Sequence, residues 1–425
     1  MKILVVGGGG REHALVWKIA QSSLVETIYC APGNPGIAEL AELVPLGVED
    51  VDGLCAFALE KQIDLTVVGP ELPLTLGIAD RFKAAGLAIF GPSQAAAQIE
   101  GSKGFSKDLM AKYGIPTAAY ARFTDRDQAV AYVREQGAPI VIKADGLAAG
   151  KGVILAQTLE EAVQAIDEIL VDGVFGEAGE SLVIEEYLYG EEASFFAFTD
   201  GKNILPLASA QDHKQIFDGD KGPNTGGMGA YSPAPVVTDV LYQRIVDEVA
   251  QPTIDGMAAE GCPYCGILFI GLMIDGDRIK VLEYNARFGD PEAQPLLSRM
   301  KSDLVPVLLD CARGELTTKA LEWYDRAAVC VVLAAKGYPG SYPKGDVIEG
   351  IDGANALDGV QVFHAGTAAR DGRIVTNGGR VLGVTGWGDS VAAAIDKAYE
   401  GVSKISWDGM QLRRDIGQKA LKRLG

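Results

Sequence analysis

Cysteine is scarce in this chain: it has six in 425 residues, at positions 30, 55, 262, 265, 311 and 330. So few thiols cannot form the framework of a disulfide-rich domain. Cys262 and Cys265 make a CxxC pair, but no second pair and no nearby histidine accompany it, which disfavours a zinc or redox site. We expect this pair to be buried, reduced thiols.

Positive net charge and long apolar runs are also missing. Lys and Arg number 38 against 57 Asp and Glu, which gives a net charge of −19 and disfavours broad binding to nucleic acid or anionic membranes. No uncharged apolar segment approaches the ~18 residues of a membrane span. The apolar run after Lys2 is too short for a signal peptide. We therefore expect a cytoplasmic monomer whose partners are small molecules, with no nucleic acid and no membrane among them.

Short apolar strands alternate with helical patterns in the first hundred residues. Strands are predicted at 3–6, 27–30, 65–68 and 88–90, and helices at 12–21, 51–60 and 74–85. This alternation predicts an α/β fold that begins with a doubly wound parallel sheet, whose ligands sit at the carboxyl ends of the strands. Three of those ends, 7–10, 31–36 and 69–71, are rich in glycine or proline.

The rest of the chain divides into three further units. After a domain at 1–100, we predict units at 101–190, 191–326 and 327–425, the last a small α/β domain. Residues 93–113 read as one helix that contains Lys103, and 116–190 read as a smaller α/β segment. There is no internal repeat and no low-complexity tract.

The glycines after the first strand predict an anion site. Val5–His13 leads from a strand through a glycine loop into a helix, whose N-terminus favours negative charge. The dinucleotide fingerprint fails, because its third glycine would fall at Glu12 or His13 and no acidic residue ends the second strand. We interpret the loop as a phosphate site and not an NAD site; the alternative is a tight strand-to-helix turn.

A second glycine-rich loop, Lys143–Gly152, joins two strands. It differs from a Walker A loop, because three residues separate Gly146 from Gly150 and Gly152 replaces the Ser or Thr that would bind Mg²⁺. A flexible flap over nucleotide phosphates fits better. Lys143 ends an apolar strand, so we expect its ammonium group in a cleft as a phosphate ligand; a solvated strand end is the alternative.

Val281–Tyr284 reads as a strand after the turn at 275–277. Because strand side chains alternate, Glu283, Asn285 and Arg287 share one face if the strand runs that far. A carboxylate and an amide oxygen suit a hard cation such as Mg²⁺, and the arginine suits the oxygens of a phosphate. Taken alone, an exposed strand end with solvated charges is the alternative.

Two further segments carry polar groups that suit ligands. The connection 183–194 links two strands and can offer backbone groups to a base and a carboxylate to ribose, although a simple acidic hinge fits as well. The long glycine-rich loop 211–229 holds Asp212, His213 and Lys214, which suit a zwitterionic substrate. We expect His213 to be an exposed loop residue with no necessary catalytic part, and His364 to be structural.

Together these segments resemble one family, the ATP-grasp ligases, and within them the phosphoribosylamine–glycine ligases. The matching segments span nearly the whole chain, with 327–425 covered more weakly, and are 7–14, 32–36, 69–71, 143–152, 212–214 and 287–292. The segment 287–292 is the most specific. The resemblance implies an ATP-grasp core with a mobile lid at about 116–190. It also implies the reaction of ATP, glycine and 5-phosphoribosylamine through glycyl phosphate to glycinamide ribonucleotide, in purine biosynthesis.

The resemblance also implies roles for single residues. Glu283 and Asn285 would bind Mg²⁺ or Mn²⁺, and Arg287 would be catalytic. ATP would contact Lys103, Lys143, Gly150, Lys151, Gly152, Glu185, Leu188 and Glu192. The other substrates would contact Gly8, Gly9, Gly10, Arg11, Asn34, Pro35, Gly36, Glu71, Asp212, Lys214, Gly289, Asp290 and Pro291.

Three rival hypotheses are weighed against this one. Another ATP-grasp enzyme, such as a carboxylase or amino-acid ligase, is disfavoured by the segments 212–214 and 287–292. A nucleotide-binding regulatory module without catalysis is disfavoured by the intact metal-binding and phosphate-binding residues. A nicotinamide oxidoreductase is disfavoured by the missing fingerprint.

Overall fold

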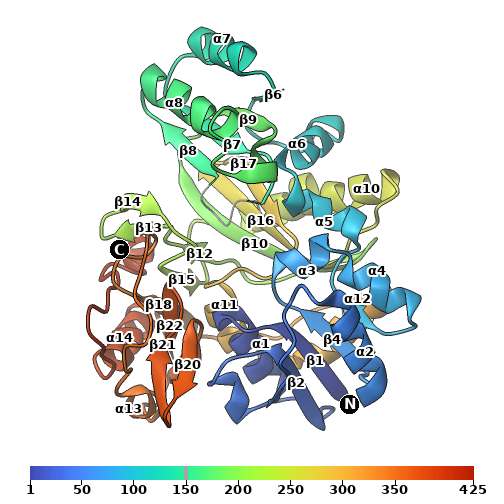
Figure 1. Ribbon diagram of the computed structural model, residues 1–425, viewed down its shortest axis with the longest axis vertical. Helices are drawn as coiled ribbons and strands as arrows, with labels where there is room; N and C mark the ends of the chain where they lie inside the picture. The colour runs from blue at the N-terminus through green and yellow to red at the C-terminus, as the bar shows by residue number, and fades with distance from the viewer. Residues whose placement is uncertain (148–151) are drawn as a thin grey trace.

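The computed structural model describes residues 1–147 and 152–425, so the predicted ATP ligands Gly150 and Lys151 lie outside the described residues. Four regular units are arranged around a common centre (Figure 1). A small unit stands apart at one end, coloured cyan to green, and the N-terminal and C-terminal parts lie side by side at the other end. The six cysteines are free, and Cys265 is the one among them that is not fully buried. Among the described residues, no helix is both long and apolar enough to cross a membrane.

The N-terminal sheet is parallel throughout, as predicted. Its strands lie in the order β3-β2-β1-β4-β5, with β1 (Lys2–Gly7), β2 (Thr27–Pro32), β3 (Glu42–Leu43), β4 (Leu65–Val68) and β5 (Ile89–Phe90). The order reverses between β1 and β4, which is where ligands bind in such sheets. The loops that follow these two strands, at 7–10 and 69–71, therefore open at the switch point.

Two predicted helices are each divided in two. The pattern at 74–85 forms α3 (Glu71–Thr75) and α4 (Ile78–Ala84), because Gly77 between them has φ of +84°. The pattern at 93–113 forms α5 (Gln94–Gly101) and α6 (Lys103–Lys112). Ser102 is extended, ends α5 and caps α6 by accepting the Phe105 N–H at 3.1 Å. This break makes Lys103 the first residue of a new helix. The other N-terminal helices are α1 (Gly10–Ile19) and α2 (Val51–Lys61).

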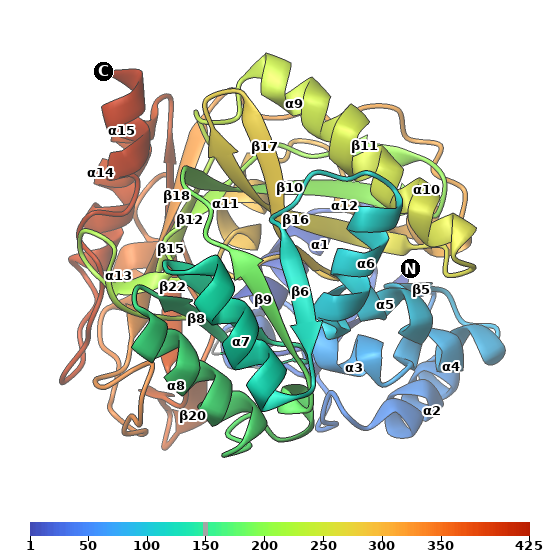
Figure 2. The ribbon, with the colours of Figure 1, turned by 90° about the horizontal axis from the view of Figure 1, so that it is seen from above.

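The unit that stands apart is an antiparallel sheet with two helices on its outer face (Figures 1 and 2). Its strand order is β6-β9-β7-β8, and it has its own apolar core. The elements are β6 (Tyr120–Phe123), α7 (Arg126–Gln136), β7 (Ile140–Ala144), β8 (Val153–Ala156), α8 (Leu159–Leu170) and β9 (Leu182–Glu186). We call residues 116–190 the lid. Since its core is separate, the lid contributes the ends of β7 and β9 to the centre without sharing the main core.

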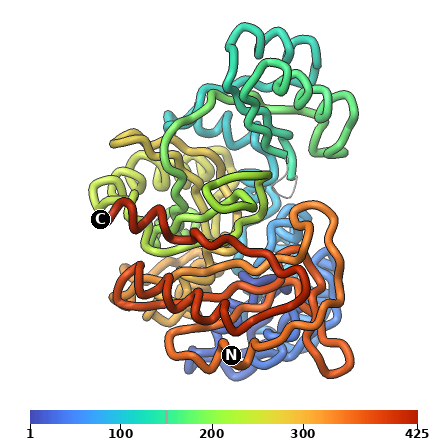
Figure 3. The backbone as a smooth tube through the Cα atoms, turned by 90° about the vertical axis from the view of Figure 1, so that its left-hand side faces the viewer, coloured from blue at the N-terminus to red at the C-terminus, as the bar shows by residue number. Residues whose placement is uncertain are grey.

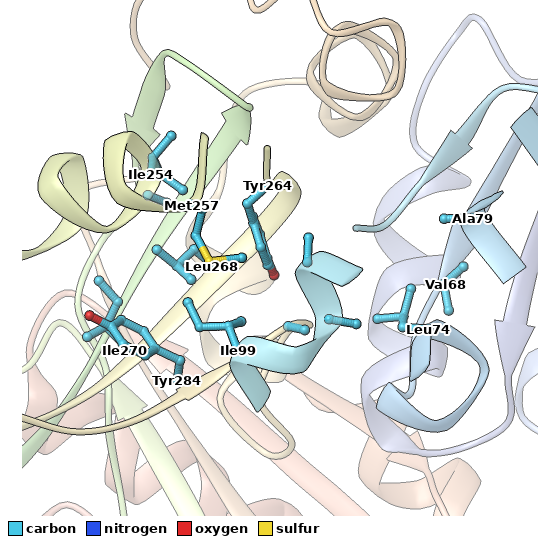
Figure 4. Packing of buried hydrophobic residues seen from close by; sticks show 14 of the residues in the cluster. Val68, Leu74, Ala79, Ile99, Ile254, Met257, Tyr264, Leu268, Ile270 and Tyr284 are labelled. Atoms are coloured by element: carbon cyan, nitrogen blue, oxygen red, sulfur yellow. The ribbon is translucent and has the colours of Figure 1, made fainter. Parts of the chain in front are cut away.

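The central sheet is antiparallel and buried on both faces. Its order is β11-β10-β16-β17, with β10 (Glu191–Asp200), β11 (Ile204–Pro206), β16 (Cys265–Asp275) and β17 (Arg278–Asn285). One face packs on the helical stretch α9 (Asp239–Ile245), the π-helical turn Val246–Ala250 and α10 (Gln251–Ala259). Figure 4 shows Ile99 between this layer and Val68, Leu74 and Ala79 of the N-terminal unit, so the two units share one core. The opposite face holds Phe196, Phe269 and Phe288 in mutual contact, over α12 (Leu304–Arg313).

The last sheet combines C-terminal strands with two strands from earlier in the chain. Its order is β12-β15-β18-β22-β19, so β12 (Gln211–Asp212) and β15 (Gly229–Ser232) extend a sheet made of β18 (Ala327–Ala334), β22 (Arg380–Gly388) and β19 (Val360–His364). A sheet thus crosses the predicted boundary at residue 327, and the four-part division stays a prediction. The remaining helices are α11 (Ala293–Arg299), α13 (Ile351–Asn355), α14 (Val391–Val402) and α15 (Gln418–Leu424). Two hairpins are formed by β13 (Gln215–Phe217) with β14 (Lys221–Asn224), and by β20 (Thr367–Arg370) with β21 (Arg373–Thr376). Short 3₁₀ turns lie at Ile37–Glu39 and Gly176–Gly179.

The C-terminal segment contacts the β13–β14 hairpin and the start of β10. In Figure 3 the red end of the chain extends beside the yellow-green chain near residue 220. Lys419 pairs with Asp220 at 2.8 Å, and the Arg423 side chain contacts Glu191. The buried Arg413 pairs with Asp220 and Asp415. These ion pairs fix the β13–β14 hairpin next to the central sheet.

Candidate active site

One cavity of about 520 Å³ lies where the N-terminal unit, the lid, the central sheet and the C-terminal sheet meet. Most of the predicted site residues with polar side chains line it. Those that line it are Arg11, Glu71, Lys103, Lys143, Gly152, Glu185, Leu188, Glu192, Asp212, Lys214, Glu283, Asn285, Arg287 and Asp290. They come from all four units, so the fold brings together groups that are up to 279 positions apart in the chain (Arg11 to Asp290).

The end of β17 places Glu283 and Asn285 toward the cavity. The strand ends at Asn285, and because the two residues are two positions apart they share a face. Burial alone would raise the pKa of Glu283, but Lys214, Lys143, Lys103 and Arg287 lower it below the usual range, so its carboxylate is charged at neutral pH. Lys214 Nζ lies 3.7 Å from Glu283 Oε1.

This pair of oxygen ligands fits one kind of cation. No cluster of three or more His, Cys, Asp or Glu side chains arranged for a metal exists in the described part of the chain. A carboxylate and an amide alone suit Mg²⁺ or Mn²⁺, hard cations whose other ligands are water and substrate phosphate. The residues present therefore fit the predicted metal.

Arg287 lies beyond the strand, in the loop before α11, and two carboxylates hold it. Its Nη2 is 2.7 Å from Glu100 Oε1 and its Nε is 3.2 Å from Glu71 Oε2. Burial raises the pKa of Glu100 to about 6, while Arg287 opposes the shift. Glu100 also accepts the Ala286 N–H at 2.7 Å. The guanidinium is thus fixed in direction by groups from α3 and α5.

The lysines of the lid and of α6 converge on a single buried carboxylate. Lys143 Nζ lies 2.8 Å from Glu185 Oε1, and Lys107 Nζ lies 2.9 Å from Glu185 Oε2. Lys143 also donates to the carbonyl of Leu282 at 3.2 Å. Burial lowers the pKa of Lys107 to about 8 and is the main cause that lowers the pKa of Lys103. Two ammonium groups thus contact the Glu185 carboxylate, and its contact with adenosine stays a prediction.

Side chains in the segment Asp212-His213-Lys214 point alternately to opposite sides of the extended chain. Asp212 and Lys214 line the cavity, and Lys214 Nζ lies 2.9 Å from Glu192 Oε2. His213 is 1% exposed, so the expectation of an exposed loop histidine is wrong. The extended chain through β12 sends His213 to the opposite, buried side, next to Tyr231. Burial, with Lys419 and Arg413 nearby, lowers the pKa of His213 to about 3.

The glycine loop is organised by Arg11 and Glu12. Gly9 caps α1, and its N–H donates to Glu12 Oε2 at 2.6 Å. Arg11 donates to the carbonyl of Phe288 at 3.1 Å and lies 2.5 Å from Glu12. Gly69 must lack a side chain here, because a Cβ would lie 2.1 Å from Glu12 Oε1. The loops after β1 and β4 therefore meet at the switch point.

The remaining predicted substrate residues lie behind this loop. Asn34 donates to the carbonyls of Gly8 (2.9 Å) and His364 (2.8 Å) and accepts from Ile37 N–H, so its side chain is already used. Gly36 packs against His13 and His364. Within the described residues, the cavity lining does not include Gly8, Gly9, Gly10, Asn34, Pro35, Gly36, Gly289 or Pro291. Their contact with substrate stays a prediction.

Comparisons with known proteins agree along the whole chain. The family models for phosphoribosylglycinamide synthetase match in three parts: the N domain at residues 1–100, the ATP-grasp (A) domain at 101–293 and the C domain at 328–419. The phosphoribosylamine–glycine ligase of Vibrio vulnificus strain YJ016 is 59% identical over 426 residues, covering 100% of this chain and 99% of the relative. That of Brucella melitensis is 56% identical over 423 residues, with the same coverage.

The chain belongs to the phosphoribosylglycinamide synthetase family. The crystal structure of phosphoribosylamine–glycine ligase from Thermotoga maritima has a TM-score of 0.85 and 33% identity, and the match covers 98% of this chain and 100% of that chain. A biotin carboxylase complex from Campylobacter jejuni has a TM-score of 0.75 at 14% identity, covering 99% and 95%, which shows the shared fold alone. The expected ATP-grasp ligase of this synthetase family, with its N-terminal parallel sheet, is confirmed.

Residues that sequence reasoning missed also line this synthetase cavity. They are Glu100, Lys107, Glu292 and Arg380. Arg380, on β22, donates to the carbonyls of Asp290 (2.5 Å) and Gly226 (2.7 Å). Its Nη2 lies 3.4 Å from Asp290 Oδ2. Burial alone would raise the pKa of Asp290, but Arg380 and Arg11 lower it. Glu292 ends the most specific motif, which is the one sequence signal that could have identified it; the other three belong to no motif.

Proposed function

We propose that this chain joins glycine to 5-phosphoribosylamine, with conversion of ATP to ADP and phosphate, to give glycinamide ribonucleotide in purine biosynthesis through a glycyl phosphate intermediate. One observation carries the proposal. In a chain of this family, one cavity is lined by Lys143 of the lid, Lys103 of α6, the β17 pair Glu283 and Asn285, Arg287, and Arg11 of the glycine loop.

The chemistry explains why such a cavity is needed. A carboxylate is a poor acyl donor, because its charge repels nucleophiles and oxide is not a viable leaving group. Transfer of the γ-phosphoryl group to glycine makes an acyl phosphate, from which phosphate can leave when the amine attacks. Catalysis of this kind depends on positioning and charge neutralisation more than on covalent work by side chains. Lys103, Lys143 and Lys214 supply the positive charge.

Arg287 is the residue we assign to the transferring group. Glu71 and Glu100 fix its guanidinium before the substrates arrive, so little reorganisation is required during the reaction. In the proposed complex it stabilises the transferring phosphoryl group and then the oxyanion formed by amine attack.

Glu283 and Asn285 are the proposed metal ligands. A Mg²⁺ or Mn²⁺ ion held there would neutralise phosphate charge. The lowered pKa of Glu283 supports this assignment, because it keeps the carboxylate anionic across the physiological range.

The lid explains how an intermediate that hydrolyses readily could survive. Lys143 and Glu185 reach the cavity from β7 and β9, so movement of the lid as a unit would open or close the ATP side and exclude water. The connection through Leu188 to Glu192 is the proposed adenosine site. We assign the sugar phosphate and the rest of that substrate to the part of the cavity near Arg11, the glycine loop and Asp290.

The proposed reaction uses small molecules only. Every group assigned to it comes from one chain, so a monomer suffices, and the reaction requires no nucleic acid or membrane.

ADP release tests the proposal. The protein is given MgATP and glycine, with and without phosphoribosylamine generated in situ. We expect ADP formation that requires both co-substrates. ADP formation with another acid or amine instead would keep the ATP-grasp assignment and refute the substrates. Binding of ATP with no turnover for any pair would favour a regulatory module.

A further inference from the structure

Glu292 is a buried carboxylate at the cavity wall whose position no ion pair explains. It is 3% exposed and lines the cavity, yet none of the ion pairs found in residues 1–147 and 152–425 includes it. It stands at the N-cap of α11, but its side chain makes no capping hydrogen bond. Its Oε1 accepts a hydrogen bond from Ser194 Oγ at 3.2 Å. A buried charge without a cation costs free energy, which suggests a functional reason for the position.

The chain makes room for this carboxylate. A Cβ at Gly289 would lie 2.3 Å from Glu292 Oε2 and 3.0 Å from Phe269, so a side chain at position 289 would displace it. Ser194 on β10 therefore holds one oxygen of the carboxylate by a hydrogen bond, and the absence of a side chain at Gly289 leaves room for the other. This is the geometry of a positioned group and not of a side chain that is buried by accident.

The charged groups around Glu292 favour a carboxyl that can take up a proton. Burial and the nearby Asp212 raise its pKa well above the usual range, whereas Lys214 and Arg287 lower it. Glu292 also interacts electrostatically with Arg380 and with the Cys330 thiol. A base is most effective when its pKa lies near the working pH.

We infer that Glu292 is the general base that accepts the proton lost by the amine of phosphoribosylamine when it attacks glycyl phosphate. The inference rests on the proposed function. In this step the amine nitrogen forms a bond to the glycyl carbonyl carbon. One N–H proton passes to the Glu292 carboxylate, the carbon–oxygen bond to phosphate breaks, and phosphate leaves with the electron pair.

Three other acidic residues of the cavity have neighbours that disfavour them as the base. Glu100 is paired with Arg287 at 2.7 Å and accepts the Ala286 N–H. Glu185 neutralises two lysines. Asp212 lies in the electrostatic field of Lys214, Glu192 and Glu283, next to the proposed metal ligands. Among the described acidic residues that line the cavity, Asp212 and Glu292 belong to no ion pair, and of these two it is Glu292 that accepts the Ser194 hydrogen bond.

The test measures ADP and glycinamide ribonucleotide in the same reaction, for the full chain and for Glu292→Gln. The wild type should release one ADP for each product. Glu292→Gln should lose about 10²–10⁴-fold in the rate of product formation, as is typical when a general base is removed. Its ratio of ADP to product should rise above one, because glycyl phosphate still forms and is then hydrolysed. A merely structural role would not change this ratio.

A control variant and a second substitution at position 292 complete the experiment. Glu322→Gln changes an exposed glutamate that pairs with Lys301, and should behave as the wild type. Loss of ADP and product in equal proportion in Glu292→Gln, or normal turnover, would overturn the inference. If Glu292→Gln does not fold, Glu292→Asp decides, because a ratio above one supports the base and a ratio of one refutes it. Absence of glycine-dependent turnover in the wild type would instead refute the proposed function.

Discussion

Lys143 Nζ lies 2.8 Å from Glu185 Oε1, and both side chains are buried where the lid meets the central sheet. Lys107 approaches the other oxygen of the same carboxylate at 2.9 Å. One negative charge therefore holds two ammonium groups, and the lysine proposed to bind ATP phosphate is oriented by the lid strand β9. We therefore propose that Glu185 positions Lys143, and its predicted contact with adenosine stays a prediction.

Glu185→Gln should therefore weaken both the fold and the binding of ATP. Removing one partner of a buried ion pair typically costs about 3–5 kcal/mol, and the freed Lys143 should raise the KM for ATP. Urea unfolding and ATP kinetics measure the two effects. Glu160→Gln, at an exposed position of α8, is the control. The preference for ATP over 2′-deoxy-ATP should not change. A loss of that preference in Glu185→Gln would show that the carboxylate holds the ribose.

Arg287→Ala should lose turnover and some stability together. Removal of one preorganised donor to a developing charge costs about 10²–10³-fold in kcat. The variant also leaves Glu100 buried without its cation, so the pKa of Glu100 should rise further and the melting temperature should fall. Arg278→Ala removes an exposed arginine at the start of β17 and is the control. A kcat near that of the wild type in Arg287→Ala would remove Arg287 from the transition state.

Glu283→Ala should increase the concentration of Mg²⁺ needed for half-maximal activity. Asn285 alone would keep one protein oxygen for the ion, and loss of the carboxylate removes the attraction that holds a divalent cation. A titration of activity with Mg²⁺ at saturating ATP measures the shift. Asp275→Asn, an exposed acidic residue on the same hairpin, should leave the titration curve unchanged. An unchanged curve for Glu283→Ala would mean that the metal binds elsewhere.

The motifs indicated where the cavity lies because each of them lies at or just after the end of a strand. Glu283 and Asn285 share a face through strand alternation, so the local pattern was enough to place these two at the cavity, whereas the glycines after β1 are absent from its lining among the described residues. Lys107 lies within α6, Glu100 near the end of α5 and Arg380 at the start of β22, and none of the three belongs to a recognisable local motif. Arg380 reaches Asp290, 90 positions earlier in the chain, only because β22 packs beside α11. Such residues depend on tertiary packing, which a single sequence does not reveal.

Local backbone breaks account for the wrong helix boundaries. Gly77 adopts a left-handed conformation and Ser102 an extended one, so two apparently continuous helical patterns are each divided. His213 was expected to be exposed because its loop is polar. The strand β12 begins two residues earlier, and alternation along it turns the ring inward. In each case a conformation of one residue, invisible to composition, decided the outcome.

His213 should make stability depend on pH. Burial lowers its pKa from 6.5 to about 3, so between these values the unfolded chain binds a proton that the folded protein does not. Stability from this residue is therefore fully present above pH 6.5 and is lost as the pH falls, by about 1.4 kcal/mol per pH unit. His213→Phe keeps a ring beside Tyr231 but cannot titrate. Between pH 7.5 and 5.5, its free energy of unfolding, measured in urea, should fall by about 1.4 kcal/mol less than that of the wild type. The carboxylates and the other two histidines titrate in both proteins and cancel in the comparison. Equal slopes for the two proteins would show that His213 is protonated as readily in the folded chain as in the unfolded one.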